Sequence, residues 1–443
     1  MGIKIDDKKW NILMFIISYT INNIVSGIAY DVYINYLQDT SESLAKSFWS
    51  YYGYSAFIGA FFLLFVSKIG YKKIVIFCVL SCSLTLIVAP YFRMSCVFYI
   101  FTLLILTGIQ LHFSILSPYV AAYTDLSNKI KWFSRTFYIG YIGFFLSTYL
   151  GGFFVVKIFA DYIQKDFHTA KMLTTAVAEM EVSMKVLYIA SMERVLVITG
   201  IISLLALIPA FLIREKKEDY SFAENKVQNK FKDSIQLIFK EVLKKDTVIY
   251  MIYWGLTNFG MGLFTSYYTV FLNRVLYIDK ATSSLMVSIS YVAMVVFMFF
   301  TDRCVNKFGQ VVTLAGTSFL AIPFMLIIAQ GDRFGSDMVY VVGFALFMRA
   351  GLMNLSSPID SSFSMELVDS DLRSIFASLI NFIAGMTSIL SGYFTGGYLF
   401  SKLEGYREAY YIAAAIYSTA GLIFFLSFRK YNRTLAEDKG EEE

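Results

Sequence analysis

Charged residues, proline, histidine and cysteine are all scarce in this sequence. Asp, Glu, Lys and Arg make up 16% of the 443 residues, whereas soluble domains carry about 25%. Five prolines and the lack of a Ser- or Gly-rich linker argue against a flexible multidomain layout. The two histidines and four cysteines match no metal-binding spacing. We therefore expect neither a resident metal nor a cofactor.

Several functional motifs are also missing. There is no G-x-x-x-x-G-K-[ST] run, so we do not expect ATP to drive the protein. Neither H-E-x-x-H nor G-x-S-x-G occurs, which argues against a membrane-embedded enzyme. The first apolar run, from Trp10, is too long for a cleavable signal and no small-residue cleavage site follows it.

Long apolar segments make up most of the chain. Hydrophobic residues account for 57% of it, and the mean hydropathy is +0.60. The 43 Phe and 32 Tyr fit a lipid-facing surface with interfacial aromatic belts. A span needs about 20 apolar residues, so the sequence predicts an all-α membrane protein with twelve transmembrane helices. The expected spans are 10–34, 47–67, 73–92, 97–122, 136–159, 195–213, 247–272, 282–301, 310–330, 337–361, 375–400 and 409–428.

Lysine and arginine are distributed unevenly between alternate loops. If the N-terminus is cytoplasmic, inner loops and tails hold 25 of the 38 basic residues, outer loops hold 12, and Arg349 lies within a span. Because cytoplasmic loops collect positive charge, we expect both termini on the cytoplasmic side of the cell (plasma) membrane.

The loop lengths suggest a domain organisation. Residues 1–213 are expected to form an N-terminal six-helix bundle with an extracellular insert at 160–194. Residues 214–246 form a cytoplasmic linker in which apolar residues at helical spacing predict an amphipathic helix. That helix lies on the anionic inner leaflet or serves as a linker helix with a solvated charged face. A C-terminal six-helix bundle at 247–428 and a charged cytoplasmic tail at 429–443 follow.

Four patterns of the first half recur in the second half, in the same order and at slowly growing shifts. Together they indicate a duplication, and a parallel repeat of six plus six helices is typical of transporters with a site near the bilayer midplane. Asn23, Gly27, Tyr33 and Leu37 recur as Asn258, Gly262, Tyr268 and Leu272 (a shift of 235), Gly70 as Gly309 (239), Ser117-Pro118 as Ser357-Pro358 (240), and Gly151-Gly152 as Gly396-Gly397 (245).

With these features the sequence resembles the major facilitator superfamily over nearly its whole length. The resemblance implies two pseudo-symmetric six-helix bundles, transport by alternating access, a monomer, and a central cavity lined by helices one, four, seven and ten. The superfamily's inner-loop motif, G-x-x-x-D-R-x-G-R-K, is partly matched by LLFVSKIGYK, in which Leu63 replaces the first glycine and Ser67 the acid. The inner-gate residues that the resemblance implies are Lys68, Gly70 and Lys72, with Lys307 and Gly309 in the second copy.

A second motif bears on the direction of transport. The fifth segment carries Gly143-x3-Ser147-Thr148-x2-Gly151-Gly152, which resembles the exporter motif G-x3-G-P-x2-G-G with Ser-Thr in place of Gly-Pro. This favours efflux. Small residues at such spacing also serve helix packing in any membrane bundle.

Polar side chains lie at similar depth in the four helices that the resemblance assigns to the cavity. A charge such as Arg349 near the bilayer centre costs at least about 2.5–3.5 kcal/mol on insertion scales. No obvious counter-ion follows from the sequence, so one hypothesis is that an anionic or polar substrate supplies it. For the repeated asparagines an interhelical hydrogen bond is an alternative to substrate contact. The expected substrate-binding residues are Asn22, Asn23, Gln110, His112, Trp254, Asn258, Arg349 and Asn354.

Three titratable residues are candidates for proton coupling, namely Asp31, Asp360 and His112. A carboxyl group removed from water holds its proton more tightly, which suits it to this task. His112 is equally well explained as a satisfied core residue.

These observations favour a secondary active transporter that moves a small organic solute by alternating access, coupled to protons and directed outward. A lipid or glycolipid flippase on the same fold, or uptake of a polar or anionic metabolite, are the alternatives. The expected partners are a small-molecule substrate, a proton and membrane lipids, with no nucleic acid.

Overall fold

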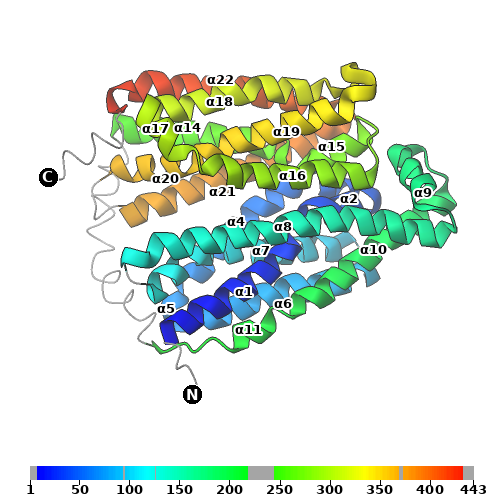
Figure 1. Cartoon of the computed structure of the whole chain (residues 1–443), viewed down its shortest axis with the longest axis horizontal. Coiled ribbons are helices and arrows are strands. Elements are labelled where there is room, and N and C mark those ends of the chain that lie inside the picture. The colour runs from blue at the N-terminus through cyan, green and yellow to red at the C-terminus, as the bar shows by residue number, and fades with distance from the viewer. Residues whose placement is uncertain (1–6, 93–94, 125, 218–243, 369–372, 433–443) are drawn as a thin grey trace. The chain divides into compact units, whose positions relative to one another are not determined.

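The protein is described by a computed structural model that covers residues 7–92, 95–124, 126–217, 244–368 and 373–432 (Figure 1). Within these ranges the secondary structure is helical and contains no strand. Nine of the described helices are long and apolar enough to cross a membrane. The other three expected spans, 47–67, 247–272 and 375–400, also fall on helices. The all-α membrane fold is therefore confirmed.

The chain divides into two compact units. Unit 1 comprises residues 1–230 and 277–288, and unit 2 comprises residues 231–276 and 289–443. The predicted amphipathic helix of the linker and most of the predicted tail lie outside the described residues. The expected bundle boundaries at 213 and 247 stay a prediction.

Unit 1 is organised around the contact between α1 and α8. Gly140, Gly143 and Gly151 of α8 face α1 so closely that a Cβ at Gly143 would lie 2.7 Å from the Thr20 carbonyl oxygen. The exporter-like motif thus packs two helices together. The helices are α1 (Asp7–Ile28), η1 (Ala29–Tyr33), α2 (Ile34–Thr40), α3 (Glu42–Lys46), α4 (Phe48–Leu64), α5 (Val66–Ile69), α6 (Tyr71–Val88), η2 (Ala89–Tyr91), α7 (Ser95–Tyr123), α8 (Leu126–Ile163), α9 (Phe167–Leu173), η3 (Thr174–Glu179), α10 (Val182–Leu204) and α11 (Leu207–Phe211).

In unit 2, α18 packs against α19 and α22, and α14 packs against α21 and α22. The division between the units falls inside α16, whose first turns group with unit 1. The helices are α14 (Lys245–Gly262), η6 (Thr265–Tyr267), α15 (Tyr268–Arg274), α16 (Lys280–Met298), α17 (Thr301–Phe308), α18 (Gln310–Ala329), η7 (Gly331–Asp337), α19 (Met338–Leu355), α20 (Ser357–Glu366), α21 (Arg373–Gly397), η9 (Leu399–Ser401), α22 (Gly405–Phe428) and η10 (Arg429–Tyr431).

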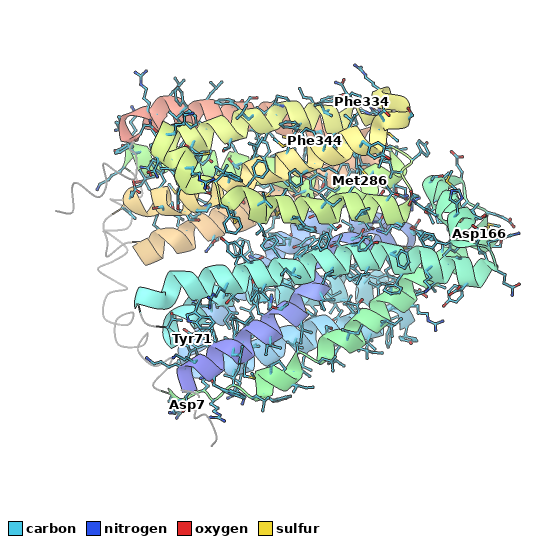
Figure 2. The ribbon with its side chains drawn as sticks, viewed as in Figure 1. Asp7, Tyr71, Asp166, Met286, Phe334 and Phe344 are labelled. Carbon is cyan, nitrogen blue, oxygen red and sulfur yellow. The ribbon has the colours of Figure 1, made fainter. Side chains whose placement is uncertain are left out.

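The connection around the expected insert is shorter than the sequence suggested. Helix α8 continues to Ile163, and α10 begins at Val182 rather than at residue 195. Two short helices, α9 and η3, fill the interval, and Asp166 caps α9 by accepting from the Thr169 backbone N–H at 3.0 Å. The bonds from Thr169 hold the pKa of Asp166 below its ordinary value. In unit 1, Asp166 lies at the end opposite to Asp7 and Tyr71 (Figure 2).

The tenth span differs from the single helix expected over 337–361. Helix α19 ends at Leu355, and Ser357 begins a new helix, α20, with Pro358 in its first turn. Proline fits there because the first helical N–H groups need no partner within the helix. Arg349 and Asp360 therefore lie on different helices, α19 and α20. The equivalent Pro118 stays inside the continuous helix α7.

Candidate substrate site

A group of aromatic and polar side chains from four helices meets inside unit 1. The His112 ring of α7 stacks on Tyr19 of α1, with ring centroids 4.1 Å apart and an interplanar angle of 19°. Tyr19 interacts with Asn23 one turn later and with Tyr141 of α8. Tyr52 of α4 hydrogen-bonds Gln110 of α7 and lies close to Tyr141. We call this set the Tyr19 cluster, and its members are Tyr19, Asn23, Tyr52, Gln110, His112 and Tyr141.

Two buried polar atoms of the Tyr19 cluster have no hydrogen-bond partner among the described residues. These are Oδ1 of Asn23 and Nε2 of His112, whose residues are 1% and 3% exposed. Leaving a buried polar atom unpaired costs about 1–3 kcal/mol. Native proteins keep such atoms where water, a ligand or a function uses them. An aromatic platform with free polar atoms suits a polar solute with a flat or ring-shaped body.

Asn22 is not part of this cluster. It lies beside the Cys82 thiol of α6, which donates instead to the Ile105 carbonyl at 3.7 Å. Neither polar atom of the Asn22 amide makes a hydrogen bond of normal geometry within the described part of the chain. The structure therefore brings together Asn23, Gln110 and His112 of the expected unit 1 residues, but not Asn22.

In unit 2, Arg349 is enclosed by aromatic side chains. It is 4% exposed, Nη1 donates to the Tyr268 hydroxyl, and the guanidinium carbon lies 4.6 Å from the centre of the Phe264 ring. Tyr410 and Tyr417 of α22 also act on it electrostatically. We call Phe264, Tyr268, Arg349, Tyr410 and Tyr417 the Arg349 cage.

The contacts of the cage are of the same order as the energy needed to bury the Arg349 charge, and they include no negative charge. A desolvated cation–π contact contributes about 2 kcal/mol, and a hydrogen bond to a charged group about 1.5–3 kcal/mol. Taking a charge out of water costs several kcal/mol even after relaxation. Across the described ranges, Nε of Arg349 and the hydroxyls of Tyr410 and Tyr417 still lack hydrogen-bond partners of normal geometry.

The remaining expected residues of unit 2 use their polar groups locally. Nδ2 of Asn258 donates to the Trp254 carbonyl and Nδ2 of Asn354 to the Ala350 carbonyl, both at 2.9 Å and one turn back on their own helices. Nε1 of Trp254 donates to the Ile380 carbonyl at 3.2 Å. These contacts position the side chains within unit 2.

Asp31 has a cation beside it. Its carboxylate pairs with Nζ of Lys280 and accepts a 2.7 Å hydrogen bond from the Ser284 hydroxyl, both from the part of α16 that belongs to unit 1. Asp31 sits in η1, a π-helical interruption of the first span, and such interruptions often mark functional positions. The Asp31 and Lys280 side chains are 1% and 0% exposed.

The sequence does not reveal this partner, because Lys280 lies just ahead of the span expected to start at 282 and so counts with the outer loops. The structure places it within α16 instead.

Asp360 has a neutral partner instead. The Tyr250 hydroxyl donates to its Oδ1 at 2.9 Å, and no ion pair joins Asp360 to a cation within the described ranges. A carboxyl group held by a phenol can lose or gain a proton without breaking an ion pair.

The glycines of the inner-gate motif begin the third helix of each repeat. Gly70 and Gly309 adopt φ values of +86° and +81°, and a side chain from the end of the sixth helix caps the helix that follows each glycine. The Glu215 carboxylate accepts from the N–H groups of Tyr71 and Lys72, at 2.5 and 3.2 Å. Oδ1 of Asn432 accepts from Val311 and Val312, at 3.0 and 3.1 Å.

The lysines of the same motif act within their own units. Nζ of Lys72 donates to the carbonyls of Phe211 and Ile213, at 2.6 and 2.9 Å. Lys68 and Lys307 lie over the rings of Phe65 and Phe308. The duplicated motif thus holds together one end of each unit.

Removing either cap should destabilise its unit. Glu215→Ala and Asn432→Ala are each expected to lower the free energy of unfolding by about 0.5–2 kcal/mol, because two N–H groups at a helix start lose their acceptor. Thermal denaturation of purified protein, followed by tryptophan fluorescence, measures the effect. Glu42→Ala, which removes an exposed carboxylate paired with Lys46 one turn away, is the control and should change stability by under about 0.5 kcal/mol. Equal stability of all three variants would show that the caps contribute nothing.

Two helical units with buried polar groups inside them define a polytopic membrane protein of the transporter class. The sequence itself matches the Major Facilitator Superfamily over residues 11–392. The chain belongs to this superfamily, and it is a transporter rather than an enzyme.

Solved structures of transporters share its fold at low sequence identity. The nucleoside transporter NupG has a TM-score of 0.69 at 13% identity, with 96% of this chain and 99% of that chain covered. A D-xylose–proton symporter has a TM-score of 0.67 at 13% identity, covering 94% and 97%. A bacterial homologue of the human lysosomal transporter Spinster, in an inward-facing and unoccupied conformation, has a TM-score of 0.69 at 16% identity, covering 97% and 98%. No curated protein matches the sequence.

Proposed function

We propose that the protein is a secondary active transporter that moves a small polar organic solute across the cell membrane by alternating access. The observation that carries the solute class is the Tyr19 cluster, in which a stacked aromatic pair stands beside the unpaired Nε2 of His112 and Oδ1 of Asn23. Such a site orients a ring by stacking and selects it by hydrogen bonds. Two of the structurally similar proteins are a nucleoside transporter and a D-xylose–proton symporter.

The direction we propose is efflux, for which the Gly143–Gly152 motif is the support. Those residues also pack α8 against α1, so the direction needs its own measurement. Everted and right-side-out vesicles from cells that produce the protein should accumulate the solute to different extents. Greater accumulation in everted vesicles supports efflux, and the reverse result supports uptake.

Solute counterflow in proteoliposomes tests the transport function itself. Vesicles loaded with an unlabelled nucleoside, pentose or sugar acid are diluted into the labelled compound, without ATP and without an ion gradient. Transient accumulation of label is expected for at least one compound. Fluorescent lipid analogues in the same vesicles test the flippase alternative, and scrambling of a glycolipid without solute counterflow would replace our proposal with it.

Proton coupling is assigned to Asp360 as first candidate, because its partner within the described residues is the neutral Tyr250. Asp31, held beside Lys280, and His112, stacked on Tyr19, are the other candidates. One of the structurally similar proteins is a D-xylose–proton symporter, and ionisable side chains within membrane-spanning segments mark proton relays in pumps and transporters.

Asp360→Asn is expected to separate exchange from accumulation. The amide keeps a hydrogen bond with Tyr250 but can no longer release a proton. Counterflow should stay within about 3-fold of the wild-type rate, while accumulation driven by an imposed pH gradient should fall at least about 10-fold, a change of 1.4 kcal/mol. Asp31→Asn, measured in parallel, shows whether accumulation driven by the pH gradient also depends on the Asp31 carboxylate. If Asp360→Asn accumulates solute like the wild type, the proton does not pass through Asp360.

A further inference from the structure

Arg349 carries a full positive charge, and the other four residues of the Arg349 cage provide no negatively charged partner for it. Arg349 is 4% exposed, and its recorded neighbours are a phenylalanine ring and tyrosine hydroxyls. No carboxylate of the described residues forms an ion pair with it. Most buried charges are paired, and in a membrane protein an unpaired one marks a substrate or ion pathway.

The contacts of the guanidinium leave one of its N–H donors without a partner among the described residues. The guanidinium carbon lies 4.6 Å from the centre of the Phe264 ring, and Nη1 donates to the Tyr268 hydroxyl. The N–H groups of arginine point outward in the plane of the guanidinium. Nε therefore presents a free in-plane donor, and the unpartnered Tyr410 hydroxyl is a second group able to donate.

A ligand that completes this arrangement must accept hydrogen bonds and carry a negative charge. A carboxylate accepts through two oxygens spaced to match the edge of a guanidinium, and this pairing is among the strongest in proteins. An amide or an alcohol of the same shape would leave the charge unpaired. A permanent Asp or Glu in the cage would neutralise Arg349 in the absence of solute. It would thereby remove the selectivity of the cage for a negatively charged solute.

We propose that the Arg349 cage binds the carboxylate of the transported solute, so that the substrate class is organic acids with a small polar body. This inference rests on the transport function proposed above and adds the charge of the solute to it. Arg349 supplies the ion pair, Tyr410 supplies a second hydrogen bond, and Phe264 and Tyr268 hold the guanidinium in place.

Matched pairs of acids and amides test the proposal on the full chain in lipid nanodiscs. The pairs are lactate and lactamide, benzoate and benzamide, nicotinate and nicotinamide, and glucuronate and glucuronamide, at equal ionic strength. A compound that binds only the folded state raises the melting temperature in proportion to the logarithm of its concentration over its dissociation constant. We expect at least one acid to stabilise the protein and its amide not to do so.

Three variants assign that effect to the cage. Arg349→Met should abolish the acid-dependent shift, and Tyr410→Phe, which removes one oxygen and keeps the packing, should weaken affinity for the acid about 10-fold. Arg349→Lys keeps the charge without the planar edge and should bind at least about 10-fold more weakly. Arg407→Met is the control, because Arg407 already pairs with Asp332 at 2.7 Å, and it should keep the full shift.

Each outcome of these experiments either supports or overturns the proposed carboxylate site. Equal stabilisation by an acid and its amide, an acid shift unchanged in Tyr410→Phe and Arg349→Lys, or no acid-selective shift at all would overturn the carboxylate site. Stabilisation by inorganic phosphate or sulfate but by no carboxylate would also overturn it. Counterflow of a neutral nucleoside or pentose alongside any of these results would leave the transport function standing.

Discussion

Lys280→Met is expected to destabilise the protein by about 3–5 kcal/mol, the loss typical when one partner of a buried ion pair is removed. The variant leaves the Asp31 carboxylate in a site where both side chains are at most 1% exposed, with the Ser284 hydroxyl as its remaining recorded donor. Methionine fills nearly the same volume, so the effect reports the lost charge. Thermal denaturation in detergent or nanodiscs measures it.

The double variant Asp31→Asn with Lys280→Met should recover most of that loss, because no charge then remains buried. The coupling energy from the four proteins isolates the pair from other effects of each substitution. Lys46→Met is the control, since Lys46 pairs at 2.7 Å with Glu42, whose side chain is 60% exposed, and it should lose under about 1 kcal/mol. A double variant as unstable as Lys280→Met would show that Lys280 stabilises the protein other than through Asp31.

His112→Phe is expected to preserve stability while transport falls at least about 10-fold, a change of 1.4 kcal/mol. Phenylalanine keeps the stack on Tyr19 but loses the hydrogen bond between the His112 ring and the Tyr19 backbone. The desolvation penalty of about 1–3 kcal/mol at the unpartnered Nε2 disappears with it and offsets that loss. Groups retained for function rather than stability behave in this way. The melting temperature and the counterflow rate of the same preparation measure both effects.

Tyr119→Phe provides the matched control in the same unit. Tyr119 also stacks on an aromatic ring, Phe15, with centroids 4.0 Å apart, but its hydroxyl donates to the Asn11 carbonyl at 3.1 Å. This variant should lose about 0.5–1.5 kcal/mol of stability and keep its transport rate. If His112→Phe instead loses stability and transports normally, His112 is a core residue and the Tyr19 cluster is not the solute site.

Hydropathy was enough to predict an all-α membrane protein, whereas the two six-helix bundles were predicted from the internal repeat and the family resemblance. Twenty-residue apolar segments have few alternatives in a membrane, because every backbone N–H and C=O must be satisfied within the segment. The duplicated glycines at 70 and 309 were also informative, because their positive φ values and side-chain caps recur in the structure. The ends of elements were less predictable, as α10 and the break before Pro358 show.

The partners of the polar residues could not be read from the sequence. Lys280 lies 249 residues from Asp31, and nothing in its local sequence distinguishes it from a loop lysine at the edge of a span. The tyrosines around Arg349 come from α15 and α22, among 32 tyrosines in the chain. Counting residues along each helix placed Asn23, Gln110 and His112 at one depth in the membrane. It gave no information on the side of the helix from which each side chain projects, which is why Asn22 was grouped with them.

Counterflow by wild-type protein and His112→Phe, in proteoliposomes with equal amounts of folded protein, tests the central claim most directly. We predict that the wild type exchanges at least one polar organic solute without ATP or an ion gradient, and that His112→Phe, with an unchanged melting temperature, exchanges it at least about 10-fold more slowly. A wild type that exchanges no such solute, or a His112→Phe variant that matches its rate, would contradict the account.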